Sequence, residues 1–172
     1  MNTQYKKLKG LYIKDESAIK FVKYIQVISI IVVIAVFAYT VFLSMMLKVS
    51  FSQLISENMT VVCGFIMAVA SLFTYYLAKQ YIHDFEAYSN IEGNRFKLLM
   101  ITIFNACFAN LVILIFGILA LVKIYQWKDV FSFNEMMQGI KKENQLNIYM
   151  GVFVIFAILF ALQITIGSLV ME

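Results

Sequence analysis

The sequence contains no proline, two cysteines, one histidine and few charged residues, which make up 14% of the chain. Soluble domains average about 25% charged residues. Both cysteines, Cys63 and Cys107, lie inside apolar runs, where a thiol behaves as a small hydrophobic group. A soluble globular domain is therefore excluded, and no disulfide is expected.

The usual signatures of catalysis and transport are also missing. The chain has no glycine-rich phosphate loop, no zinc-ligand spacing and no Gly-x-Ser-x-Gly elbow. No Asp, Glu, Lys, Arg or His lies inside an apolar run, which argues against a proton-coupled carrier or a voltage sensor. The lack of proline-interrupted helices argues against a secondary transporter. We therefore predict a protein that is not an enzyme and uses no cofactor or metal.

What the chain has in abundance is apolar sequence. Hydrophobic residues make up 62% of it, and the mean hydropathy is +0.84. Four uncharged runs, at about 24–47, 58–78, 98–122 and 147–171, each reach the length of about 20 residues that a helix needs to cross a bilayer. The sequence therefore predicts an all-α membrane protein in contact with the lipid bilayer. We expect a four-transmembrane-helix bundle that occupies residues 1–172 as one domain.

The distribution of Lys and Arg predicts the orientation of this bundle. Nine of them lie in segments 1–23 and 79–97, against five in connections 48–57 and 123–146. By the positive-inside rule, the first two segments and both termini are expected in the cytoplasm. Thirteen of the fourteen basic residues are Lys, and Ile and Asn are abundant, which suggests an AT-rich coding sequence of bacterial or mobile-element origin. The bacterial inner membrane is the expected location. Basic residues beside a membrane can bind anionic headgroups, so no direct nucleic-acid binding is expected.

Polar residues inside the apolar runs form the first candidate site. Segment 98–122 carries Asn105 and Asn110 among small residues, which predicts an inner helix packed on two sides. In the four-span arrangement, Ser71, Asn105 and Gln163 each lie eight residues from the cytoplasmic side, or about 12 Å deep. We predict a polar layer there that fixes helix register through hydrogen bonds. A pore lining is the alternative.

The second candidate site is a docking surface for a soluble cytoplasmic partner. The second span is expected to continue as a helix to about Ser89, beyond the bilayer. The surface would comprise Ile82, His83, Asp84, Phe85, Glu86 and Arg95. His83 and Glu86 have helical i, i+3 spacing that could hold a metal, but further ligands are missing, so a solvated helix face is favoured.

The third candidate site is a short amphipathic helix in connection 123–146. Its apolar stripe consists of Phe133, Met136, Met137 and Ile140, with Trp127 as a neighbouring interface anchor. It is expected to lie on the outer leaflet. A sensor of the outer leaflet or of an outside ligand is one interpretation, and a connection that packs onto the bundle is the favoured one.

Two functional hypotheses follow. The first is a membrane subunit that forms a homo-oligomer and anchors or regulates a cytoplasmic protein, sensing membrane perturbation in bacterial defence or immunity. The alternative is an oligomeric channel or a permeabilising effector.

Local patterns further predict helix N-caps at Asp15, Ser50 and Asn58.

Overall fold

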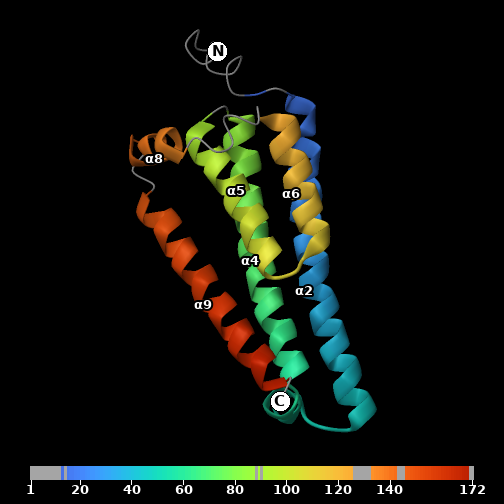
Figure 1. Cartoon of the computed structure of the whole chain (residues 1–172). Helices are drawn as coiled ribbons and strands as arrows, with labels where there is room; N and C mark the ends of the chain where they lie inside the picture. Colours follow the sequence, from blue (N-terminus) through green and yellow to red (C-terminus); the bar gives the residue numbers. More distant parts are fainter. Residues whose placement is uncertain are drawn as a thin grey trace.

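The computed structural model describes residues 13, 15–87, 89, 91–125, 133–142 and 146–170, and the regular secondary structure among them is helical (Figure 1). The elements are η1 (Glu16–Ala18), α2 (Ile19–Leu47), α3 (Phe51–Glu57), α4 (Met59–Glu86), α5 (Ile91–Cys107), α6 (Leu111–Ile124), α8 (Phe133–Lys142) and α9 (Leu146–Val170). Within the described ranges, three stretches are long and apolar enough to cross a membrane: Glu16–Leu47, Met59–Glu86 and Asn147–Ile166. The predicted all-helical class is confirmed for these ranges.

Helices α2 and α4 form an antiparallel pair joined by the short helix α3 (Figure 1). Asp15 accepts a hydrogen bond from the Ser17 N–H at 2.9 Å at the start of η1. The Ser50 hydroxyl caps α3 at 3.2 Å from the Gln53 nitrogen. Asn58 caps α4, where its side-chain oxygen accepts from the N–H of Val61. All three predicted caps are confirmed.

The structure differs from the sequence prediction in segment 98–122. Instead of one spanning helix, α5 and α6 form a helical hairpin that turns about midway along α2 and α4 and returns to the end where α2 begins (Figure 1). The turn places Ala109 in the left-handed region with φ of 53°. The Asn110 side chain then accepts a hydrogen bond from the Ile113 N–H at 3.4 Å and caps α6. Asn110, which was expected in the middle of a spanning helix, therefore caps the start of a second helix.

Close packing holds the two arms of the hairpin together and to the long helices. A Cβ atom added at Gly117 of α6 would lie 2.5 Å from Oγ1 of Thr102 on α5, so only glycine permits this approach. The buried hydroxyls of Tyr81 and Tyr125 lie 3.0 Å apart, which ties the end of α4 to the end of α6.

The position of α8 also differs from the prediction. It lies at the end of the bundle where α2 begins and α4 ends, not at the opposite end with α3, and α9 then runs back toward α3 (Figure 1). Met136 and Ile140 of α8 are fully buried. This agrees with the interpretation as a connection that packs onto the bundle. Trp127 lies outside the described residues, and the side chain of Phe133 is not among those described.

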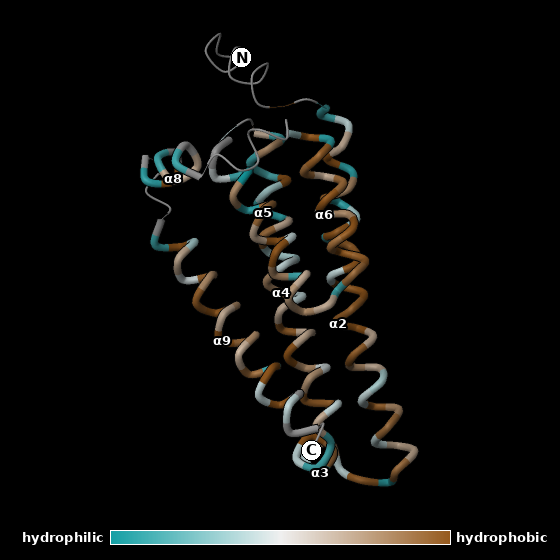
Figure 2. Tube along the Cα trace, in the orientation of Figure 1, coloured by the Kyte–Doolittle hydropathy of each residue, from teal (hydrophilic) through white to brown (hydrophobic). Residues whose placement is uncertain are grey.

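The bundle therefore has two unlike halves, which we call the hairpin half, containing α5, α6 and α8, and the open half, containing α3 and the far ends of α2 and α9. The core lies in the hairpin half, where Ile25 of α2 and Phe156 of α9 are fully buried. In the open half, Met45 of α2 is 74% exposed. Figure 2 shows apolar residues along most of the length of α2, α6 and α9, as expected for helices that face lipid.

Candidate functional sites in the two halves of the bundle

A buried ion pair joins α4 to the start of α5 at the hairpin end. The Lys97 ammonium group pairs with the Asp84 carboxylate, and it also donates to Oδ1 of Asn94 at 3.4 Å. The Lys97 side chain is only 2% exposed. Removing one partner of such a pair leaves an uncompensated buried charge, so this contact fixes the geometry of the hairpin entrance.

The ion pair and the surrounding core reduce the predicted docking surface. Phe85 and Arg95 are buried in the bundle, so neither is available to a soluble partner. Asp84 is engaged with Lys97. Glu86 remains exposed and pairs with Lys23 of α2 at 2.9 Å. Sequence reasoning placed Arg95 on the surface because it expected residues 79–97 to project beyond the bundle, whereas α5 begins inside it.

The rest of this surface is solvent-facing or partly so. The His83 side chain is exposed, with its ring Nδ1 3.4 Å from Oδ1 of Asp84, and Ile82 is half-buried. Among the described residues, no cluster of three or more His, Cys, Asp or Glu could hold a metal ion.

The predicted polar layer is divided between the two halves. In the hairpin half, the buried amide of Asn105 donates to Oγ1 of Thr74 at 3.1 Å and to the carbonyl of Ile101 at 2.8 Å. Thr74 lies one helical turn from the buried Ser71 on α4. Asn105 thus joins α5 to α4, in the way predicted for structural hydrogen bonds. Asn110 is instead the cap of α6.

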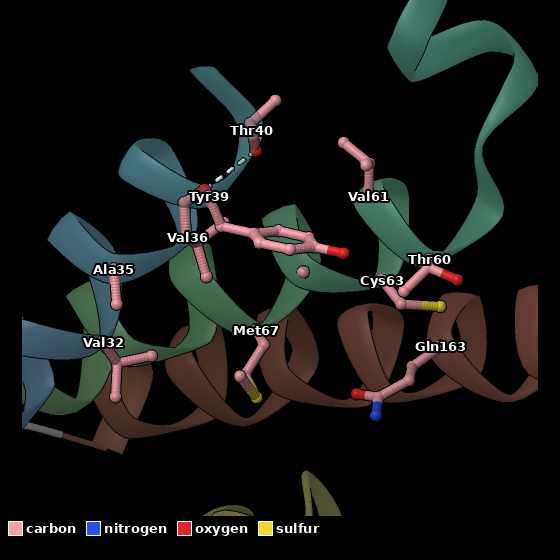
Figure 3. A pocket seen from close by; sticks show the side chains of 11 residues that line it. Val32, Ala35, Val36, Tyr39, Thr40, Thr60, Val61, Cys63, Met67 and Gln163 are labelled. Carbon is pink, nitrogen blue, oxygen red and sulfur yellow. Dashed lines mark hydrogen bonds between the residues drawn. The ribbon is translucent and has the colours of Figure 1, made fainter. Parts of the chain in front are cut away.

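Gln163 lies elsewhere because α9 runs in the direction opposite to the predicted one. It lines a groove of about 470 Å³ in the open half, between α2, α4 and α9, together with residues such as Tyr39, Cys63 and Met67 (Figure 3). Cys63 is eight residues from Ser71 on α4, or about 12 Å along the helix. The Gln163 side-chain oxygen is buried and has no hydrogen-bond partner among the described residues. The structure therefore does not bring Gln163 to Asn105.

A second, more polar groove runs along α4 beside α9 in the hairpin half. It consists of two neighbouring pockets that share Tyr76, and we call the one nearer the end of α4 the upper part and the other the lower part. The upper part has a volume of about 390 Å³. The lining consists of Tyr75, Tyr76, Lys79, Gln80, His83, Asp84, Lys97, Ile148 and Tyr149. Sequence reasoning used Lys79 only in the count of basic residues in segment 79–97. The recurrence of Tyr76, Lys79 and His83 on one helical stripe was the signal that could have located this groove.

Comparison of the chain with protein-family models, curated proteins and solved structures found no match in any of the three.

Proposed function

We propose that this chain is a non-enzymatic membrane protein that anchors or regulates a soluble protein at the cytoplasmic face of a membrane. In this proposal, α2, α4 and α9 span the bilayer and the α5–α6 hairpin enters it from the cytoplasmic side. The observation that carries the proposal is the position of the basic residues. Every described Lys and Arg except Lys48 lies at the hairpin end.

The hairpin explains why the sequence indicated orientation only weakly. With a continuous third span, connection 123–146 and its four lysines would lie opposite the amino-terminal lysines. With a hairpin, the described lysines of both regions, such as Lys20 of α2, Lys123 of α6 and Lys141 of α8, lie at one end, and the positive-inside rule then favours a cytoplasmic hairpin end strongly. The expectation that both termini lie in the cytoplasm is replaced by one in which α9 ends on the outer side.

The same end carries the exposed charges that a soluble partner would meet. Lys20, His83, Glu86 and Lys141 are exposed there, on α2, α4 and α8. Among the described residues at the open end, the exposed charges are Lys48, just after α2, and Glu57 of the short helix α3. A partner with an acidic surface matches this excess of lysine, because complementary charge steers association. By analogy of size alone, we extend the proposal to a role in bacterial defence or immunity at the inner membrane.

The test is purification of the tagged protein from its host in mild detergent, with identification of the proteins that accompany it. A stoichiometric soluble partner is expected. Lys141→Glu should reduce its recovery, whereas the matched variant Lys48→Glu, at the open end, should retain it. A chain that purifies without any soluble partner, or an equal loss in both variants, would contradict the docking proposal.

One observation favours a second candidate, a homo-oligomeric channel. The unpartnered Gln163 oxygen in the open half lies in the apolar region, where an amide gains from a hydrogen bond to a neighbouring chain. For this candidate, the purified protein should be an oligomer that Gln163→Leu dissociates, and it should conduct ions in liposomes. A stable oligomer that conducts no ions would support self-association but contradict the channel function.

A further inference from the structure

We propose that the groove along α4 beside α9 binds one anionic phospholipid of the leaflet that surrounds the hairpin end. The inference rests on the cytoplasmic orientation in the proposed function but not on the soluble partner. The upper part of the groove would hold the phosphate-containing headgroup, and the lower part would hold an acyl chain.

The groove has two parts of opposite character that meet at one residue. The upper, polar part contains Tyr76 together with Lys79 and Lys97. The lower part, also about 390 Å³, is lined by Val69, Leu72, Phe73 and the same Tyr76. A ligand that fills both parts must therefore be polar at one end and apolar at the other. A soluble phosphate would occupy only the upper part.

The dimensions of the groove match one lipid leaflet. It follows a single stripe of α4 from Val69 to His83, which corresponds to about 21 Å at 1.5 Å per residue. A bilayer with its headgroups is about 40–45 Å thick, so one leaflet is about 20–22 Å. The edge contact of Phe73 with Phe156, with ring centroids 6.0 Å apart, joins the lower part to α9.

The charges in the upper part favour an anion. Lys97 and Lys79 face the groove with one carboxylate, Asp84, and Asp84 is paired with Lys97. Lys79 is exposed and supplies the remaining positive charge. Basic pockets between helices on the cytoplasmic side are the usual sites for anionic headgroups.

Hydrogen-bond donors lie beside these charges. The Tyr76 hydroxyl accepts a hydrogen bond from the Gln80 amide at 2.7 Å, which leaves its own O–H free to donate to a phosphate oxygen. The Lys97 ammonium lies 6.0 Å from the Tyr149 ring centroid, so α9 closes the groove next to the paired lysine.

Native mass spectrometry of the full chain in detergent tests this proposal. After its lipids are removed, the protein is titrated with phosphatidylglycerol and with phosphatidylcholine of identical acyl chains. One phosphatidylglycerol should bind in preference to phosphatidylcholine. Lys79→Gln should weaken it about fivefold, the effect of one lysine near an anionic surface. Lys141→Gln, an exposed lysine on α8 at the same end but outside the groove, is the matched control and should leave binding unchanged.

The apolar part is tested without changing charge. Leu72→Trp should fill the lower groove and displace the lipid, whereas Ile118→Trp, on the exposed face of α6, should not. Glycerol phosphate should compete poorly, because it lacks the acyl chain. Equal binding of the two lipids, equal loss in Lys79→Gln and Lys141→Gln, or full competition by glycerol phosphate would overturn the proposal. None of these outcomes depends on whether a soluble partner is found.

Discussion

The hairpin half and the open half of the bundle share the same three long helices but are packed differently. In the hairpin half, α5 and α6 fill the space between these helices, and Ile25 and Phe156 are fully buried. In the open half, α2, α4 and α9 enclose a groove, and Met45 of α2 is 74% exposed. Among the described residues, the hairpin half thus contains three additional helices, α5, α6 and α8, whereas the open half contains only the seven-residue α3.

The polar contacts follow the same division. Helix association inside a membrane depends on close packing and hydrogen bonds, because lipid tails are as apolar as the side chains. The hairpin half has both, in the approach of Gly117 to Thr102 and in the hydrogen bond from Asn105 to Thr74. The open half has an amide, Gln163, whose oxygen has no partner among the described residues. The hairpin half is therefore held by both kinds of contact, whereas the open half presents an amide that lipid or another chain could contact.

The largest expected effect concerns which side of the membrane each half faces. In a Cys63→Ala, Cys107→Ala background, Ser52→Cys of α3 and Ser168→Cys of α9 should react in intact cells with a membrane-impermeant maleimide. Gln138→Cys of α8 should react only after lysis if, as proposed, the hairpin end to which α8 belongs faces the cytoplasm. All three substituted residues are exposed. Labelling of Gln138→Cys with protection of Ser168→Cys would instead support four spans.

The next-largest effect is a loss of stability when the packing of the hairpin is disturbed. Gly117→Ala should lower the stability of the detergent-solubilised protein by about 1–3 kcal/mol, because its Cβ would lie 2.5 Å from the Thr102 oxygen. Thermal unfolding measures the loss, and Thr102→Ala in the same chain should restore much of it. Gly151→Ala of α9 is the matched control, since a Cβ there meets nothing within 4 Å. It should be neutral or stabilising, because alanine favours helix over glycine. Equal effects at both glycines would contradict the assigned packing.

Sequence patterns were sufficient for the local structure of this chain. Apolar runs located α2, α4 and α9, and polar residues beside them located the caps at Asp15, Ser50 and Asn58. These features depend on residues a few positions apart, so neighbouring sequence determines them. The amphipathic stripe of α8 was likewise correct in Met136 and Ile140, which are buried.

The hairpin could not be predicted in the same way, because length and apolarity do not distinguish one spanning helix from two shorter ones. Residues 98–122 satisfy the length of a span, yet the left-handed Ala109 and the cap at Asn110 divide them. The four lysines of connection 123–146 were the available signal, since they conflicted with the four-span orientation. The errors in the positions of α8 and Gln163 follow from this point: once α9 reverses direction, Gln163 moves to the open half.

A smaller effect on stability distinguishes Asn105, whose amide is hydrogen-bonded to α4, from Gln163, whose side-chain oxygen has no partner among the described residues. Asn105→Leu should lower stability by about 0.6–2 kcal/mol, because it removes the hydrogen bond between α5 and α4. Gln163→Leu removes a side-chain oxygen that has no partner in the described chain, so it should cost nothing or raise stability in a monomeric detergent sample. Thermal unfolding of the two variants in parallel measures the difference. A larger loss for Gln163→Leu would contradict the assignment of Asn105 as the hydrogen-bonded amide and Gln163 as the unpaired one.

The smallest effect concerns the first cap of the hairpin half. Hydrogen bonds from the Ser17 hydroxyl and then from its backbone N–H lower the pKa of Asp15 below its usual value of about 3.9. Because the folded-state pKa is lowered, the stabilisation is present above the usual value and is lost as pH falls through the folded pKa. Asp15→Asn keeps a good cap but cannot titrate. The difference in unfolding midpoint between wild type and this variant should therefore shrink on acidification from pH 5 to pH 3. For Ser50→Ala, which removes the uncharged cap of α3, the difference from wild type should not change with pH. A constant difference for Asp15→Asn would show that its charge contributes nothing to the cap.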